Sequence, residues 1–315
     1  MTAPTGLRGV VPPVCTPFTA DLEIDVPSLR RLVDHLIDGG VDGLFVLGST
    51  SEVAYLPDAQ RRLVTETVVE RVGGRVPVLA GAIDMTTPRV CEHAVDAVKD
   101  GADGVVVTAP FYTRTHPAEI ERHFRLLADR VQAPIYAYDL PVSVHVKLDG
   151  GMLLRLAADG VLAGLKDSSG DDGALRRLLV GRRDLGAAAA RFAVLTGSEL
   201  TVDAALAMGV DGVVPGLGNV DPGGYARLYR LCRAGDWVAA RREQERLLRA
   251  FGIVEVADGA RMGGSSAALG AFKAALHLLG VIDDPITAPP QVPLNAAEVA
   301  CIGEILDAAG LAPRS

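Results

Sequence analysis

The chain has 315 residues, a length that suits an α/β barrel with an extension better than one small domain. Its 49 % hydrophobic and 22 % charged residues are typical of a globular protein with a sizeable core. The formal net charge of −8 argues against nucleic acid or an anionic membrane as the main partner, although a pocket for a small anionic substrate can still be locally positive.

Cysteine usage and the N-terminal segment indicate a cytoplasmic protein. The four cysteines are widely spaced without a CxxC pair, which is typical of reduced thiols (Cys15, Cys91, Cys232 and Cys301). The first ten residues, MTAPTGLRGV, lack the apolar core of an export signal. The sequence contains no stretch of about 18 uninterrupted apolar residues, so it predicts no membrane span.

One local pattern occurs three times, at 39–48 (GGVDGLFVLG), 100–110 (DGADGVVVTAP) and 208–216 (MGVDGVVPG). Each copy is typical of a helix that ends at glycine, a tight turn and a short apolar strand. The strands lack polar alternation, which favours burial on both faces, as in a parallel sheet.

In chain order, the sequence predicts eight strands separated by helices. The predicted strands are 10–14, 43–47, 76–80, 104–108, 134–138, 162–166, 191–195 and 212–214. The clearest helices between them are 26–38, 57–72 and 87–99. This alternation predicts a TIM (β/α)8 barrel, in the α/β class. The alternative is an open doubly wound sheet. That fold typically has a glycine-rich phosphate loop after the first strand, and the CTPF found there is not such a loop.

From about residue 236 the pattern becomes wholly helical, interrupted by a proline-rich connection at 283–294 (DDPITAPPQVPL). We therefore expect two parts. Residues 1–235 form the barrel that carries the active site, and residues 236–315 form a C-terminal helical extension packed on it.

Polar residues gather where the predicted strands end, which in a barrel is the mouth of the active site. LGSTSE (47–52) offers hydroxyls and backbone N–H groups that suit a carboxylate or phosphate, or equally a turn with a helix cap. TAPFYT (108–113) places Phe111 and Tyr112 in a loop, where they can face a substrate or a neighbouring subunit. IYAYDLP (135–141) brings Tyr136 or Tyr138 to the mouth.

Lysine is scarce in this chain, with four residues against an arginine-rich background, and Lys166 is the best candidate nucleophile. It ends the predicted sixth strand, one strand away from Tyr138. Lys99 lies at a helix end, Lys147 in a polar loop and Lys273 on a C-terminal helix. A desolvated amine can attack a ketone to form a Schiff base, and a nearby phenol can move the required proton.

Other polar residues near these strand ends receive more ordinary interpretations. The six histidines show no HxH or HxxxH spacing, and the sequence predicts no metal site. His145 is expected to face solvent rather than substrate. Asp167 is expected to cap the following helix rather than to orient a neighbouring hydroxyl. Asp139 has two open roles, contact with a substrate or tuning of Tyr138.

Together these motifs resemble the pyruvate-dependent class I aldolase superfamily of N-acetylneuraminate lyase and dihydrodipicolinate synthase. The resemblance covers roughly residues 7–280 in the expected order. It is carried by TPF (16–18), GSTSE (48–52), TAPFY (108–112), YDLP (138–141) and GLKDSSGD (164–171).

The resemblance implies a role for each matching residue. Lys166 forms the Schiff base with pyruvate or another 2-oxo acid, and Tyr138 is the proton shuttle. Tyr112 enters the active site of a partner subunit, which implies a homodimer or homotetramer. No cofactor beyond the lysine imine is implied. Substrate-binding positions are expected at Gly48, Ser49, Thr50, Ser143 and Gly216.

Two positions depart from the family pattern. Ser51 stands where the loop usually has glycine, which is expected to narrow the pocket or alter the turn. Ser143 stands where dihydrodipicolinate synthases typically carry an arginine for the second substrate's carboxylate, although Arg114 is a possible substitute. This difference argues against lysine biosynthesis.

The favoured function is a lyase that cleaves a 2-oxo-3-deoxy acid to pyruvate and an aldehyde. The alternatives are a dihydrodipicolinate synthase, or a sugar-acid dehydratase that uses the same imine. A third reading is a non-catalytic ligand-binding barrel, which the presence of both Lys166 and Tyr138 argues against.

Overall fold

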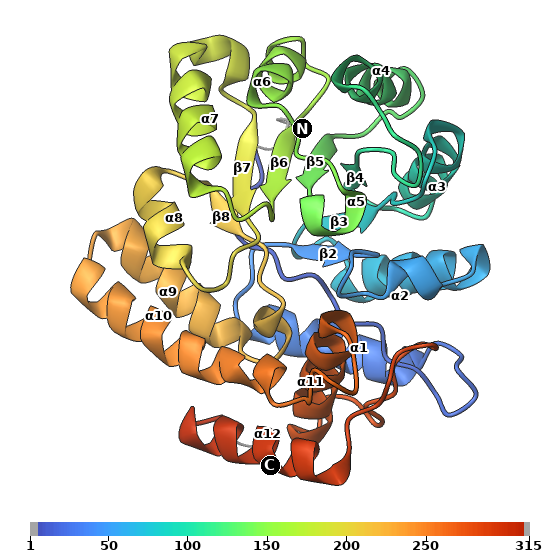
Figure 1. Ribbon diagram of the computed structural model, residues 1–315, viewed down its shortest axis with the longest axis vertical. Helices are drawn as coiled ribbons and strands as arrows, with labels where there is room; N and C mark the ends of the chain where they lie inside the picture. The colour runs from blue at the N-terminus through green and yellow to red at the C-terminus, as the bar shows by residue number, and fades with distance from the viewer. Residues whose placement is uncertain (1–5, 312–315) are drawn as a thin grey trace.

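A computed structural model describes residues 6–311, in which strands and helices alternate along the chain (Figure 1). One sheet contains eight parallel strands in the order β1-β8-β7-β6-β5-β4-β3-β2. The strands are β1 (Gly9–Val10), β2 (Leu44–Val46), β3 (Val78–Gly81), β4 (Gly104–Thr108), β5 (Ile135–Asp139), β6 (Gly164–Asp167), β7 (Ala193–Thr196) and β8 (Gly212–Val213).

The segment that follows β1 forms hydrogen bonds with β2, and these bonds close the sheet into a barrel. Pro13 and Phe45 form a parallel bridge. The Phe45 N–H donates to the Pro12 carbonyl at 3.1 Å, and the Val14 N–H donates to the Phe45 carbonyl at 2.8 Å. The chain is therefore a TIM barrel, as predicted, and the open doubly wound sheet is excluded.

The observed strands lie within two residues of the predicted positions except at β1. β4 has the predicted bounds, whereas β1 ends at Val10 instead of Val14. Pro12 and Pro13 lack an N–H, so this segment cannot form a continuous ladder. The segment instead contributes a carbonyl acceptor and the Val14 N–H to individual hydrogen bonds with β2.

Helices surround the barrel and continue past it (Figure 1). Helices α1 and α3 have the predicted bounds, and α2 begins one residue late. Short 3-10 turns are η1 (Val53–Tyr55), η2 (Gly186–Ala189), η3 (Leu217–Asn219) and η4 (Gly252–Glu255). The helices are α1 (Val26–Asp38), α2 (Asp58–Val72), α3 (Thr87–Lys99), α4 (Pro117–Ala128), α5 (Pro141–Val144), α6 (Gly150–Ala158), α7 (Asp172–Asp184), α8 (Val202–Met208), α9 (Pro222–Ala234), α10 (Trp237–Phe251), α11 (Gly264–Leu278) and α12 (Ala296–Ala308).

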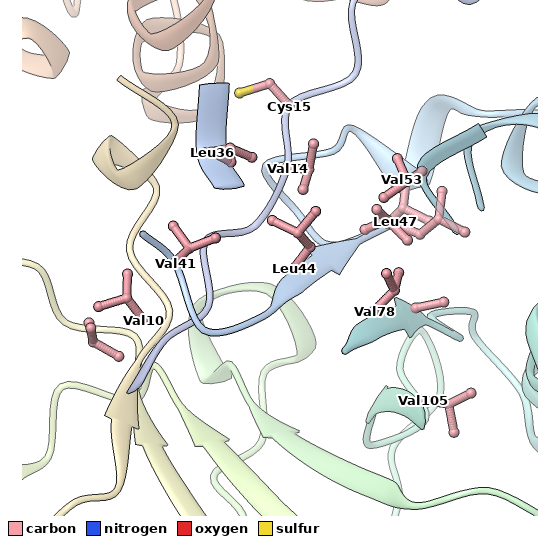
Figure 2. Close-up of a cluster of buried hydrophobic side chains, with 14 of the residues drawn as sticks. Val10, Val14, Cys15, Leu36, Val41, Leu44, Leu47, Val53, Val78 and Val105 are labelled. Carbon is pink, nitrogen blue, oxygen red and sulfur yellow. The ribbon is translucent and has the colours of Figure 1, made fainter. Parts of the chain in front are cut away.

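Alternating side chains along each strand divide the core into two parts. In β2, Leu44 and Val46 face the helices, whereas Phe45 faces the barrel interior. Figure 2 shows the outer part, where Leu44 lies near Val14 and Val78 beneath the helices. Strands buried on both faces explain the uninterrupted apolar runs in the sequence.

The threefold sequence pattern has a structural basis at the amino ends of the strands. The aspartates of its three copies, Asp42, Asp103 and Asp211, each precede an even-numbered strand. Each carboxylate accepts a 2.8 Å hydrogen bond from a backbone N–H of the preceding strand, on Val10, Val78 and Val194 respectively. Each aspartate's own N–H donates to the carbonyl of that same residue. A two-point clamp thus joins neighbouring strands at three places.

The C-terminal helices pack on one side of the barrel (Figure 1). Helix α10 lies along α9 and α8, and α11 contacts η3 and α12. The Arg31 guanidinium on α1 donates to the Val281 carbonyl at 3.2 Å and pairs with Asp283. The predicted division near residue 235 falls at the turn between α9 and α10, where Gly235 has φ of +76°. The division itself stays a prediction.

No helix within residues 6–311 is long and apolar enough to span a bilayer. Within the same range, no group of three or more His, Cys, Asp or Glu side chains is arranged to hold a metal ion. The N-terminal segment weighed above as an export signal lies half outside the described residues.

Replacing Asp103 by alanine tests the clamp. Asp103→Ala leaves the partly buried Val78 N–H without its acceptor, so we expect the free energy of unfolding to fall by about 1 kcal/mol. Urea denaturation measures this change. Asp129→Ala, at an exposed position after α4, is the matched control and is expected to change stability little. Equal effects of the two substitutions would contradict the clamp.

Candidate active site

Lys166 and Tyr138 lie side by side at the carboxyl ends of β6 and β5. They are direct partners in the register of the two strands. The Lys166 Nζ atom lies 4.0 Å from the centroid of the Tyr138 ring and 4.9 Å from that of Phe45. All three side chains are buried. The structure therefore brings the predicted nucleophile and the predicted proton shuttle together in an apolar setting.

The layer below Lys166 fixes which tyrosine faces the mouth. Tyr136 lies two residues before Tyr138 and points into the barrel, where it lines a small apolar cavity beneath Lys166 with Phe45. Gly164 makes room for it, because a Cβ atom there would lie 2.6 Å from the Tyr136 ring. Of the two tyrosines that the sequence left open, Tyr138 is thus the one beside the lysine.

The environment of Tyr138 makes its phenol more acidic. Burial alone raises the pKa of this hydroxyl. The positive charge of Lys166, and hydrogen bonds with Lys166, Ser49 and Ser168, outweigh burial, so the pKa lies below its ordinary value. A phenol with a lowered pKa gives up its proton more readily, which suits proton transfer at neutral pH.

The turn after β2 is braced from below by Ser51. The buried Ser51 hydroxyl donates to the Val14 carbonyl at 2.6 Å and accepts the Gly48 N–H at 3.2 Å. The Thr16 hydroxyl donates to the Ser51 carbonyl at 2.8 Å. The serine that departs from the family pattern therefore supports the turn from inside. Gly48 is needed for space, because a Cβ atom there would lie 2.6 Å from the Phe45 ring.

The same turn presents free donors to a ligand. The Ser51 N–H closes on the Gly48 carbonyl at 3.1 Å, and the Glu52 N–H closes on the Ser49 carbonyl at 3.0 Å. Among the described residues 6–311, the N–H groups of Ser49 and Thr50 donate to no other group, so they can bind an acceptor from outside. Adjacent backbone donors of this kind suit a carboxylate.

Glu199, in the loop after β7, lies within reach of the Lys166 charge and was not predicted from the sequence. Its Oε1 atom accepts the Leu217 N–H at 2.7 Å and the Tyr225 hydroxyl at 3.1 Å. Burial raises the pKa of Glu199 to about 7, against the opposing effects of hydrogen bonds from Leu217, Gly216 and Tyr225 and of the Lys166 charge. Its position after a strand was the available signal, because acidic residues there face the mouth.

Two aspartates near the site have structural contacts. Asp139 is buried, pairs with Lys147 and accepts the Leu148 N–H at 3.1 Å, so it holds the segment after β5. The expectation that Asp167 caps the next helix was wrong. Asp167 accepts the Ser169 N–H at 2.9 Å, whereas Asp171 caps α7. Four residues separate Asp167 from the start of α7, which is too far for a cap, so its carboxylate closes a local turn instead.

The remaining predicted residues lie around the rim. Gly216 follows β8, where a Cβ atom would lie 2.8 Å from the Phe272 ring. Ser143 and His145 are exposed on and after α5. Tyr112 is 89 % exposed and has φ of +76°, a left-handed conformation that is uncommon for a tyrosine.

Known proteins share both the sequence and the fold. The chain matches the model of the dihydrodipicolinate synthetase family over residues 6–309. It is 33 % identical over 305 residues to 4-hydroxy-tetrahydrodipicolinate synthase of Kineococcus radiotolerans, covering 96 % of this chain and 94 % of that protein. It is 35 % identical over 286 residues to an uncharacterised DapA-like lyase of Halobacterium salinarum, covering 91 % and 89 %.

A solved structure agrees with these matches. The prophage protein YagE of E. coli K12, in complex with pyruvate, has a TM-score of 0.88 and 30 % sequence identity to this chain. The match covers 96 % of this chain and 99 % of that one. Because the family model extends from the first strand to the last helix, the chain belongs to the dihydrodipicolinate synthetase family and is a carbon–carbon lyase of the class I aldolase type.

Proposed function

We propose that this lyase cleaves a 2-oxo-3-deoxy acid to pyruvate and an aldehyde through a Schiff base on Lys166. The observation that carries the proposal is the placement of the Lys166 amine 4.0 Å from the ring of Tyr138, with both side chains buried at the barrel mouth. The side-chain amine can attack a ketone as a nucleophile, and the phenol supplies a proton-transfer group within reach.

The proposed reaction proceeds in four steps. The Lys166 amine attacks the C2 ketone, and the Tyr138 phenol gives its proton to the departing water, which leaves a protonated imine and a phenolate. The Tyr138 phenolate takes the proton of the C4 hydroxyl while the C3–C4 bond breaks and its electron pair moves toward the imine. The aldehyde leaves, and the resulting enamine takes the Tyr138 proton at C3. Water then hydrolyses the protonated imine, which releases pyruvate, restores the amine and returns a proton to Tyr138.

We assign the carboxylate of the 2-oxo acid to the turn after β2. The N–H groups of Ser49 and Thr50 and the Thr50 hydroxyl are the donors. The Ser49 side chain helps to lower the pKa of Tyr138, so the bound carboxylate and the proton shuttle share a neighbour. At Gly48 and Gly216, the missing Cβ atom lets the chain pack closely against the Phe45 and Phe272 rings.

Condensation in the synthase direction is the alternative that the relative from Kineococcus favours. A second substrate with a carboxylate would need a cation near α5. Ser143 is exposed there and uncharged, which supports cleavage of a substrate whose aldehyde half is neutral. Dehydration through the same imine would retain all carbons of the substrate, and product analysis separates the three reactions.

Trapping the imine tests the nucleophile. With pyruvate and borohydride, we expect a reduced pyruvyl adduct on Lys166, located by peptide mass spectrometry, and none in Lys166→Ala. The other lysines serve as internal controls. If neither pyruvate nor any 2-oxo-3-deoxy acid labels Lys166, the aldolase proposal is wrong and a ligand-binding role replaces it.

Removing the phenol hydroxyl tests the proton shuttle. We expect Tyr138→Phe to lower kcat about 10²- to 10⁴-fold, because the C4 hydroxyl loses its proton acceptor. Borohydride trapping of pyruvate on Lys166 should persist, since the amine remains. Tyr136→Phe, one layer below, is the control and should retain kcat. Similar losses in both variants would argue against the role given to Tyr138.

Mixing two inactive variants tests whether Tyr112 acts in a partner's site, as its exposure and left-handed backbone support. Tyr112→Ala and Lys166→Ala are each expected to be nearly inactive. After unfolding and refolding together, mixed dimers contain one site with both residues, so about a quarter of wild-type activity should return. If sedimentation shows that the refolded mixture is dimeric but its activity does not return, Tyr112 does not act in a partner's site.

A further inference from the structure

A buried ion pair connects the C-terminal helices to the turn after β2. Lys273 of α11 pairs with Glu52, and neither side chain is exposed. From the sequence, Lys273 was expected on a C-terminal helix and was given no role. Burying two charges is costly unless geometry and hydrogen bonds compensate, so a fully buried pair calls for a structural explanation.

The surroundings of Lys273 hold its ammonium in one place. The Nζ atom donates to the Ile286 carbonyl at 2.6 Å and lies 4.2 Å from the centroid of the Phe18 ring. Burial raises the pKa of the neighbouring Cys15 thiol to about 12. Cys15 therefore stays neutral, and Glu52 is the anion that Lys273 meets.

The surroundings of Glu52 are equally complete. Its Oε2 atom accepts the Ala288 N–H at 2.7 Å and the Gln291 amide at 2.9 Å, while Oε1 faces Lys273. Glu52 has φ of +60°, a left-handed conformation that needs support in a residue with a side chain. The proline-rich connection and α11 supply that support from the far end of the sequence.

Glu52 directly follows the donors of the carboxylate site. Its N–H closes the turn on the Ser49 carbonyl at 3.0 Å. A change in the backbone of Glu52 therefore moves Ser49 and Thr50. Apolar residues of similar size at positions 52 and 273 would stabilise the fold as well as an ion pair does. They would not hold the side chain of residue 52 in one direction, as Lys273 holds the Glu52 carboxylate.

We propose that Lys273 and Glu52 are positioning residues that hold the turn Gly48–Ser51 in its carboxylate-binding shape. The C-terminal region thereby completes the active site without touching substrate. This inference rests on the proposed function in one respect, the assignment of the 2-oxo acid carboxylate to Ser49 and Thr50.

Lys273→Met is the principal test, with Arg182→Met as the matched control. Arg182 pairs with Asp211 at the amino end of the barrel, away from the turn. Two quantities are measured for each variant. One is amide hydrogen exchange of the peptide containing residues 47–55. The other is the pyruvate concentration that half-saturates borohydride trapping on Lys166.

Lys273→Met is expected to speed exchange in residues 47–55 and to raise the half-saturating pyruvate concentration about tenfold, as for one lost hydrogen bond to a carboxylate. Trapping at saturating pyruvate should stay near the wild-type rate. Arg182→Met should lower stability and leave both quantities unchanged. If the lone Glu52 charge prevents folding, Glu52→Gln/Lys273→Met removes both charges and should shift both quantities in the same direction.

If Lys273→Met leaves hydrogen exchange in residues 47–55 unchanged, the inference is overturned, whatever the half-saturating pyruvate concentration of the variant. Faster exchange with an unchanged pyruvate requirement would also overturn it, because the turn would then not bind the carboxylate, while the Lys166 imine would stand. Failure of every 2-oxo acid to label wild-type Lys166 would refute the proposed function instead. The exchange measurement would still decide whether the pair holds the turn.

Discussion

The register between β5 and β6 is the constraint on which the catalytic face depends. Because side chains alternate along a strand, a slip of one residue would turn Lys166 outward into the helices. The packing of Tyr136 over Gly164, one layer below, favours the observed register, in which Lys166 pairs with Tyr138. A structural contact in the barrel interior therefore supports the contact between Lys166 and Tyr138 at its mouth.

Local sequence patterns were sufficient for most of the fold. Apolar runs between glycines predicted eight strands, and amphipathic spacing predicted α1 and α3 to the residue. These signals are local because a strand buried on both faces needs only a short apolar run. The exception was β1, where Pro12 and Pro13 replace ladder bonds with carbonyl acceptors, a feature that apolar content alone does not reveal.

The site was predictable where chemistry and position coincide. Lys166 and Tyr138 end neighbouring strands, so their meeting followed from the barrel itself. Glu199 and Lys273 were missed because their roles depend on partners far away in the chain, Leu217 for one and Glu52 for the other. The role of Asp167 was predicted wrongly because two aspartates, Asp167 and Asp171, precede α7, and spacing alone does not decide which one accepts the helix N–H groups.

The aspartate clamps lie at the amino ends of the strands, and the proposed reacting groups, Lys166 and Tyr138, lie at the carboxyl ends. Strand alignment and the proposed chemistry thus depend on opposite ends of one barrel. Loops at the mouth can change length or composition while the clamped base keeps the strands aligned. For protein engineering, this separation leaves Ser143 and its neighbours in the loops at the mouth open to redesign for a new aldehyde, with the base of the barrel left untouched.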